Sequence, residues 1–201
     1  MTVRVERTEG VLRVVLDRPD KANALTAEML EAVRDAVRGA SGDVLILTGA
    51  GKVFSAGADL EAARAGLAVS PLWEDVSGAI AKFPGLTLAA LNGSCAGGAM
   101  GMMLACDCRI TVPEASFFYP VMKMGYLPQP SDPGRLAALV GPARAKMILV
   151  GAAKIGAAEA LAMGLVDRIA EDLTTEIEGL AAVARAAPEG HTAAVKAMIP
   201  V

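Results

Sequence analysis

An apolar run followed by a glycine-rich segment occurs twice in this chain, and this repeat limits the folds that the chain can adopt. The run VLILTG at 44–49 precedes FSAGADL at 54–60, and LTLAAL at 86–91 precedes NGSCAGGAMGMMLACD at 92–107. Apolar runs of this length are typical of strands that are covered on both faces, as in parallel sheets. We therefore predict an α/β protein in which each glycine segment lies at the carboxyl end of a buried strand.

The remaining patterns predict further helices and strands. The alternating residues on either side of Glu9 and Gly10 are typical of a hairpin. A helical spacing of apolar residues begins at Thr26, and a second helical stretch at 61–84 is interrupted around 69–71. The other expected elements are strands at 109–112 and 116–119, helices from Asp132 onward, and alanine-rich helices at 172–186 and 189–199.

Composition excludes several classes of function. A chain of 201 residues with 54% apolar content and a net charge of −3 is expected to form one globular domain, and no basic run suggests nucleic acid as a partner. The first ten residues lack the apolar region of a secretory signal, and polar residues and glycines interrupt the apolar stretch at 86–106. We therefore expect a cytoplasmic protein without a membrane span. The cysteines match no common zinc spacing, so we expect reduced thiols and no metal site.

The glycine segments are suited to binding a ligand oxygen. Because glycine has no Cβ atom, the neighbouring backbone N–H groups can come within hydrogen-bond distance of a bound molecule. Two such donors directed at a carbonyl oxygen stabilise the negative charge that develops on it during reaction. The sequence therefore indicates a site in which backbone amides hold the reacting oxygen.

Four segments, in this order along the chain, resemble the enoyl-CoA hydratase/isomerase family, the crotonase superfamily. They are RPDKANALT at 18–26, the two glycine segments, and AAEALAMGLVDRI at 157–169. The resemblance implies a spiral of strand-strand-helix repeats, with a core at 1–187 and a short helical tail at 188–201. It also implies a homotrimer or a dimer of trimers, and a role in fatty acid metabolism.

The resemblance assigns roles to particular residues. The backbone amides of Ala58 and Gly98 would form an oxyanion hole for the enolate of an acyl-CoA thioester. No cofactor would be bound permanently, because coenzyme A arrives as part of the substrate. The positions expected to contact coenzyme A are Lys21, Ala22, Ala24, Ala56, Asp59 and Leu60. Lys21 is equally well explained as an exposed turn residue, and Asp59 as the cap of the following helix.

The chain departs from the family pattern at both expected catalytic glutamates. Gly101 occupies the glutamate position of the pattern GGGxE, and Val121 occupies that of FxxPE. Hydration of a double bond requires a base and an acid, so a hydratase with these residues needs a substitute. The chain also ends at Val201, where the family usually continues through further helices, which predicts a shortened helical C-terminus.

Asp132 is the first candidate for the missing proton carrier, because it follows the GYLPQPS loop, which in this family passes near the acyl group. The alternative is that Asp132 caps a helix, since Pro133 follows it. Tyr119, Lys123 and Tyr126 lie near the second empty position and have core or rim roles as their alternative, whereas His191 is expected at the surface. Five methionines near the motifs are expected to line an acyl pocket or to pack in the core: Met100, Met102, Met103, Met122 and Met124.

Three functional hypotheses follow from these residues. The first is an enoyl-CoA hydratase/isomerase-like enzyme that stabilises a thioester enolate and uses a nonstandard acid or base. The second is a non-catalytic acyl-CoA binding protein or partner subunit, which the two missing glutamates favour. The third is a structural subunit without ligand, in which the glycines persist only for packing.

Overall fold

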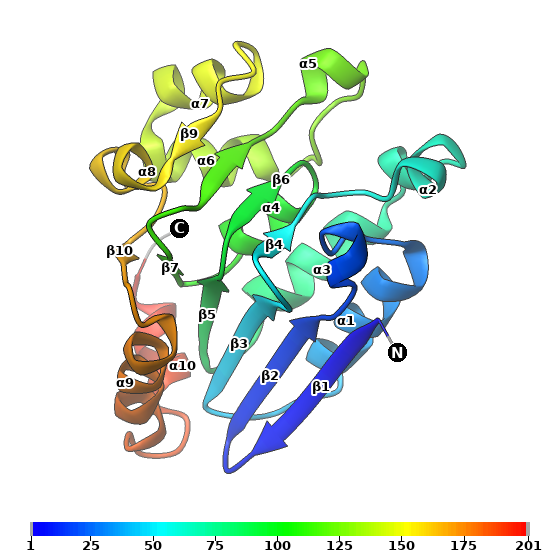
Figure 1. Cartoon of the computed structure of the whole chain (residues 1–201). Coiled ribbons are helices and arrows are strands. Elements are labelled where there is room, and N and C mark those ends of the chain that lie inside the picture. The colour runs from blue at the N-terminus through cyan, green and yellow to red at the C-terminus, as the bar shows by residue number, and fades with distance from the viewer. Residues whose placement is uncertain (1, 200–201) are drawn as a thin grey trace.

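The computed structural model describes residues 2–199 and contains two sheets (Figure 1). The larger sheet has the strand order β1-β2-β3-β5-β7-β10, and the smaller one has the order β4-β6-β8-β9. The strands of the larger sheet are β1 (Val3–Thr8), β2 (Val11–Leu16), β3 (Val44–Gly49), β5 (Leu86–Leu91), β7 (Cys108–Thr111) and β10 (Arg168–Ile169). Those of the smaller sheet are β4 (Val53–Ser55), β6 (Ser94–Ala96), β8 (Ser116–Phe118) and β9 (Ile155–Gly156).

The predicted strands are confirmed: the hairpin and the strands at 44–49, 86–91 and 109–112 lie in the larger sheet, and the strand at 116–119 lies in the smaller one, whereas β4, β6, β9 and β10 were not predicted. Strands β1 and β2 form an antiparallel hairpin in which Val3 pairs with Leu16, and Glu9 and Gly10 form its turn with positive φ angles of 37° and 82°. Strands β2, β3, β5 and β7 run parallel to one another. The pairing of β3 with β5 sets the two apolar runs side by side, so the glycine segments that follow them leave the same edge of the sheet.

Helices surround the two sheets, and most of them lie where the sequence predicts helices. They are α1 (Ala27–Arg38), α2 (Leu60–Arg64), α3 (Leu72–Ala81), α4 (Ala99–Leu104), α5 (Val121–Met124), α6 (Asp132–Val140), α7 (Pro142–Leu149), α8 (Ala157–Met163), α9 (Leu173–Arg185) and α10 (His191–Ala197). The stretch at 61–84 is interrupted earlier than predicted, because Gly66 takes a φ of 110° after α2. Helix α5 was not predicted.

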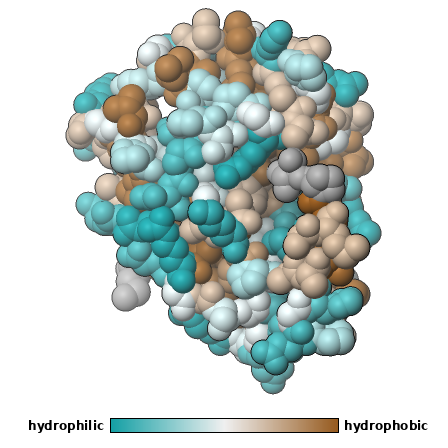
Figure 2. Space-filling view, turned by 180° about the vertical axis from the view of Figure 1, so that it is seen from behind, coloured by the Kyte–Doolittle hydropathy of each residue, from teal (hydrophilic) through white to brown (hydrophobic). Residues whose placement is uncertain are grey.

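Both faces of the larger sheet are covered, which explains the continuous apolar runs. Leu45 and Leu47 of β3 belong to the main core, in which α1 and α3 pack together, whereas Val44 and Ile46 face a second cluster formed with α9. On the face turned away from the viewer of Figure 1, hydrophilic and hydrophobic residues are interspersed (Figure 2). No helix among residues 2–199 is long and apolar enough to cross a membrane.

The C-terminal helices are attached to the ends of the strands. The Nζ atom of Lys196 in α10 forms an ion pair of 2.7 Å with Asp107 and donates to the carbonyl oxygens of Phe83 and Gly85. Helix α10 lies within the predicted tail at 188–201, of which residues 200 and 201 are outside the described part of the chain. This tail therefore contacts the loops that precede β5 and β7.

Candidate functional site

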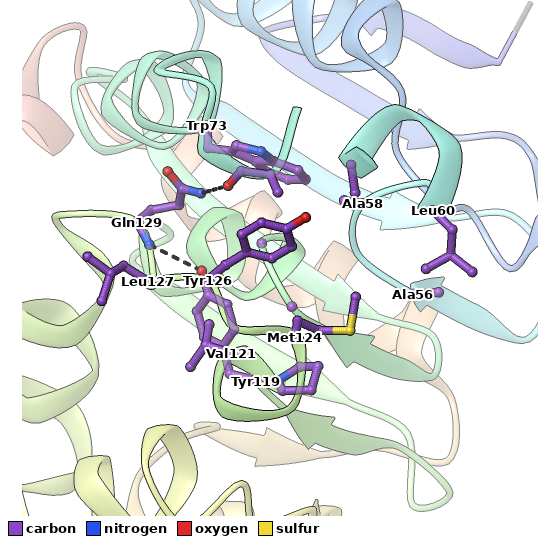
Figure 3. A pocket seen from close by; sticks show the side chains of 15 residues that line it. Ala56, Ala58, Leu60, Trp73, Tyr119, Val121, Met124, Tyr126, Leu127 and Gln129 are labelled. Carbon is purple, nitrogen blue, oxygen red and sulfur yellow. Dashed lines mark hydrogen bonds between the residues drawn. The ribbon is translucent and has the colours of Figure 1, made fainter. Parts of the chain in front are cut away.

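The two glycine loops meet at a single pocket. Strand β4 pairs with β6, and the loops after these strands touch, because a Cβ atom on Gly57 would lie 2.7 Å from the carbonyl oxygen of Ala96. The pocket has a volume of about 150 Å³ and includes Ala58 from the first loop and Gly98 from the second. Its other lining residues are Ala56, Leu60, Ala63, Ala68, Trp73, Gly97, Tyr119, Pro120, Val121, Met124, Tyr126, Leu127 and Gln129 (Figure 3).

The first loop is shaped by polar groups. Gly57 has a φ of 90°, and its N–H donates to Oγ of Ser55 over 3.1 Å. The carbonyl of Gly57 accepts from the N–H of Leu25, and the N–H of Asp59 donates to the carbonyl of Leu25. The Asp59 carboxylate accepts from the backbone N–H groups of Glu61 and Ala62 and so caps α2. These bonds fix the backbone on both sides of Ala58.

The second loop is shaped by packing. Gly97 has a φ of 55° and donates its N–H to the carbonyl of Phe118 over 3.0 Å. Gly98 follows at the start of α4, and a Cβ atom on it would lie 2.9 Å from ring carbons of Trp73. The Trp73 ring is itself held by a 2.8 Å hydrogen bond from its Nε1 to the carbonyl of Leu67. Glycine at position 98 therefore lets the indole lie directly against the backbone.

The backbone N–H groups of Ala58 and Gly98 are free at this junction. Within residues 2–199, neither group donates to a backbone or side-chain acceptor. Buried and partly buried N–H groups in folded proteins are usually paired with some acceptor. Two free donors that line one pocket are therefore a suitable binding site for a single oxygen atom of a ligand.

A carboxylate lies against Gly101, the position at which the family pattern predicts the first glutamate. Asp132 is 1% exposed, and a Cβ atom on Gly101 would lie 2.7 Å from its Oδ1 atom. The hydroxyl of Tyr119 donates to Oδ2 of Asp132 over 2.8 Å, whereas Oδ1 has no hydrogen-bond partner in the described part of the chain. The absence of a side chain at Gly101 therefore makes room for a carboxylate that comes from α6.

The interpretation of Asp132 as a helix cap is wrong. The cap position of α6 is Ser131, and Asp132 is the first residue of the helix. Its carboxylate accepts from Tyr119 and from no backbone N–H of the helix. The side chain is directed into the protein because Ser131 is anchored to α3, where its N–H and hydroxyl donate to the Glu74 carboxylate over 2.9 and 2.6 Å.

Burial changes the acidity of this pair. Removal from water raises the pKa of Asp132 to about 6, and the negative charge of Glu74 adds to the rise. The hydrogen bond from Tyr119 and the charge of Arg135 oppose it. Burial also raises the pKa of Tyr119, and the neighbouring Asp132 raises it further. A carboxyl group with a pKa near 6 exchanges its proton close to neutral pH, which is useful for acid-base chemistry.

Of the other candidate residues, some line the pocket and some lie away from it. Val121 lines the pocket, so the second glutamate position carries an apolar side chain there. Tyr126 also lines the pocket, whereas Lys123 and His191 are exposed, as expected for His191. The expectation of a methionine-lined pocket is wrong for all but Met124. Met100, Met102 and Met103 are buried in the core, and Met122 is 60% exposed outside the pocket.

The positions predicted for coenzyme A lie next to one another around the first glycine loop. Ala56 and Leu60 line the pocket, and the N–H of Ala56 donates to the carbonyl of Ala22 over 2.9 Å. The carbonyl of Lys21 accepts from the N–H of Ala24, and the Lys21 side chain is exposed. Asp59 does not line the pocket, and Arg18 donates to its carboxylate over 2.8 Å, which lowers the pKa of the carboxyl group.

Sequence reasoning missed the residues that hold the first loop. Asn23 is fully buried, accepts from the N–H of Arg18, and donates to the carbonyls of Ala50 and Val53. The hydroxyl of Ser55 donates to the carbonyl of Asn23 over 2.8 Å. The signal in the sequence was Asn23, a polar residue between two alanines in RPDKANALT. Its role could not be predicted because Ala50, Val53 and Ser55, which it contacts, are about 30 residues further along the chain.

Comparison with solved structures shows that this is the crotonase fold. A crystal structure of an enoyl-CoA hydratase from Mycobacterium avium subsp. paratuberculosis superposes with a TM-score of 0.89 and 28% sequence identity, over 98% of this chain and 85% of the other. A structure of an enoyl-CoA hydratase/carnithine racemase from Magnetospirillum magneticum also gives 0.89, at 27% identity, over 98% and 79% of the two chains.

Sequence comparison identifies the family. The family model for enoyl-CoA hydratase/isomerase matches residues 6–199, and the chain belongs to this family. A probable enoyl-CoA hydratase of Mycobacterium leprae is 32% identical over 194 residues, which cover 90% of this chain and 78% of the relative. A probable enoyl-CoA hydratase of Rhodobacter capsulatus is 36% identical over 204 residues, which cover 97% and 79%.

Proposed function

We propose that this protein is an enzyme that binds an acyl-CoA thioester and stabilises its enolate through the amides of Ala58 and Gly98. The observation that carries the proposal is that both N–H groups are free within the described chain and line the same pocket. Donors already in place at a developing oxyanion lower the barrier, because they need no rearrangement during the reaction. The names of the relatives, which are enoyl-CoA hydratases, agree with a thioester substrate.

The acid-base group of this proposal is the pair formed by Tyr119 and Asp132. Tyr119 lines the pocket, and Asp132 lies behind it, joined to its hydroxyl by the 2.8 Å hydrogen bond. When Asp132 is ionised, the phenol donates to it. When Asp132 is protonated, it donates to the phenol oxygen, and the phenol proton is then available to the pocket. The pair thus moves one proton without a carboxylate at position 101 or 121.

Two findings favour a second candidate, a non-catalytic acyl-CoA binding protein or partner subunit. Val121 places an apolar side chain in the pocket where the family has a glutamate. Asp132 is 1% exposed and does not itself line the pocket. Under this alternative the scaffold and the oxygen site are kept, and the buried carboxylate has only a packing and hydrogen-bonding role.

A matched pair of variants at Gly98 tests the oxyanion hole. Gly98 has a φ of −60°, which suits proline, so Gly98→Pro removes the N–H without demanding a new φ. Gly98→Ala places a similar Cβ atom against Trp73 but keeps the N–H. Turnover is followed by mass spectrometry on saturated, unsaturated and 3-hydroxy acyl-CoA thioesters.

We expect the proline variant to be at least about 100-fold slower than the alanine variant, since loss of one such donor costs that much. Equal turnover by the two folded variants would exclude the Gly98 amide from the mechanism. Binding without turnover of any thioester by the native protein would support the non-catalytic alternative. By family likeness we also expect a homotrimer or a dimer of trimers, which light scattering on the purified protein checks.

A further inference from the structure

The pocket is lined by the tryptophan and both tyrosines of the chain. The sequence contains one tryptophan and two tyrosines, and Trp73, Tyr119 and Tyr126 all line this pocket. Figure 3 shows the Tyr126 ring projecting across the pocket between Trp73 and Met124, with its hydroxyl directed to the side of Ala58. The wall that faces the two free amides is therefore largely aromatic.

These aromatic walls are held in place. Trp73 is fixed by its hydrogen bond to the carbonyl of Leu67, and Tyr119 is fixed by its bond to Asp132. The loop that carries Tyr126 is tied down beyond it, since Nε2 of Gln129 donates to the carbonyl of Ala68 and Ser131 donates to Glu74. The Tyr126 hydroxyl has no hydrogen-bond partner within residues 2–199, and the ring lines the pocket.

The size of the pocket limits what can lie beside the amides. Its volume is about 150 Å³, and apolar cavities of about 150 Å³ take up benzene. Leu60, Met124 and Leu127 line it and are 62%, 49% and 85% exposed, so the pocket opens to solvent beside them. Tyr126 lies across the interior, so a long acyl chain would have to displace its ring to pass.

We propose that the pocket prefers to bind thioesters whose acyl group is no larger than about a benzene ring, that benzoyl-CoA, which has no α-hydrogen and so binds without forming an enolate, is the tightest ligand of this size, and that Tyr126 sets this limit. The inference rests on the proposed function, in which the thioester carbonyl binds at Ala58 and Gly98. A planar ring gains from edge-to-face or offset contacts with Trp73 and Tyr126 beyond the area that it buries. A flexible chain gains no such contact and loses more conformational freedom on binding.

The test is calorimetric titration of the full chain with free coenzyme A and with acetyl-, butyryl-, benzoyl- and octanoyl-CoA. We expect benzoyl-CoA to bind at least about tenfold more tightly than octanoyl-CoA, which is the range of discrimination that an apolar pocket reaches. Tyr126→Ala opens the interior and should lower this ratio about tenfold while leaving the affinity for free coenzyme A unchanged. Tyr126→Phe keeps the ring and should keep the preference. Tyr126→Leu is the second truncation if circular dichroism shows that the alanine variant is unfolded.

The outcomes separate this inference from the proposed function. Equal or tighter binding of octanoyl-CoA by the native protein would overturn the size limit while leaving thioester binding intact. An unchanged ratio in both folded truncations would remove Tyr126 from the limit. Failure of every thioester to bind more tightly than free coenzyme A would overturn the proposed function, and the size limit with it.

Discussion

The first glycine loop lies near the surface, with Ala56 and Leu60 exposed, whereas every residue of α4 after the second loop is buried. The first loop is held by hydrogen bonds that Asn23 donates and that Ser55 and Asp59 accept. Close packing of Trp73 and Asp132 against glycines holds the second. Two backbone donors at one pocket are thus positioned by polar contacts on one side and by core packing on the other.

This difference predicts where each half of the pocket is vulnerable. A loop that is held by hydrogen bonds should be damaged by the removal of a polar partner. A loop that is held by packing should be damaged by added volume or by an unfavourable charge in the core. Gly57 is the exception on the first side, because it is where the two loops touch.

The largest effect is expected for Gly57→Ala. Its φ of 90° is unfavourable for alanine, and the new Cβ atom would lie 2.7 Å from the carbonyl oxygen of Ala96. Strain and overpacking together should lower the free energy of unfolding by about 4 kcal/mol, measured by urea denaturation. Gly97→Ala is the control, since its φ of 55° is also positive but its Cβ would meet only Gly57 Cα at 3.7 Å. It should cost about 1 to 2 kcal/mol, and equal losses would show that the contact between the loops is not tight.

The second largest effect is a pH dependence of stability. It is expected from Asp132, which packs against Gly101 in the helix after the second loop. The pKa of Asp132 is about 6 in the folded protein, compared with about 3.9 in an unfolded chain. Because the folded value is raised, this group favours the folded state fully below pH 4, and its contribution is lost as the pH rises through 6. The loss amounts to about 3 kcal/mol.

Asp132→Asn removes this titration. The difference in the free energy of unfolding between the native protein and the variant should therefore shift in favour of the variant between pH 4 and 7. In the first loop the sign is opposite, because the pKa of Asp59 is lowered and its contribution is lost on acidification. A constant difference between native protein and Asp132→Asn across this range would contradict the buried, protonatable carboxyl group.

The smallest effect is expected for the cap of the first loop. Asp59→Ala removes the acceptor for two N–H groups of α2 and the partner of Arg18. We expect the melting temperature to fall by about 2 to 4 °C, as for the loss of one helix cap in a chain of this size. Asp172→Ala is the control. It removes a similar cap from α9, and no residue of α9 lines the pocket.

The two caps should differ in binding. Asp59→Ala should weaken the affinity for acetyl-CoA in a calorimetric titration, because the backbone on one side of Ala58 is then less well fixed. Asp172→Ala should lower the melting temperature by a similar amount and leave this affinity unchanged. Equal affinities in both variants would mean that the first loop keeps its shape without the cap.

Most secondary structure could be predicted from local pattern. The hairpin around Glu9 and Gly10, the strands at 44–49 and 86–91 and the helix that begins after Thr26 depend on residues close together in the chain. Their apolar spacing is therefore visible in the sequence. Helix α5 was missed because four residues are too few to show a period.

The sequence by itself determined the fold family and the two glycine segments that follow its buried strands. Only the tertiary structure decided that Asp132 is not a cap but fills the space beside Gly101, 31 positions earlier, and that Trp73 and Tyr126 line one pocket. The physical reason is that periodicity and glycine chemistry act over a few residues. The environment of a buried carboxyl group or an aromatic ring is made by segments that only folding brings together.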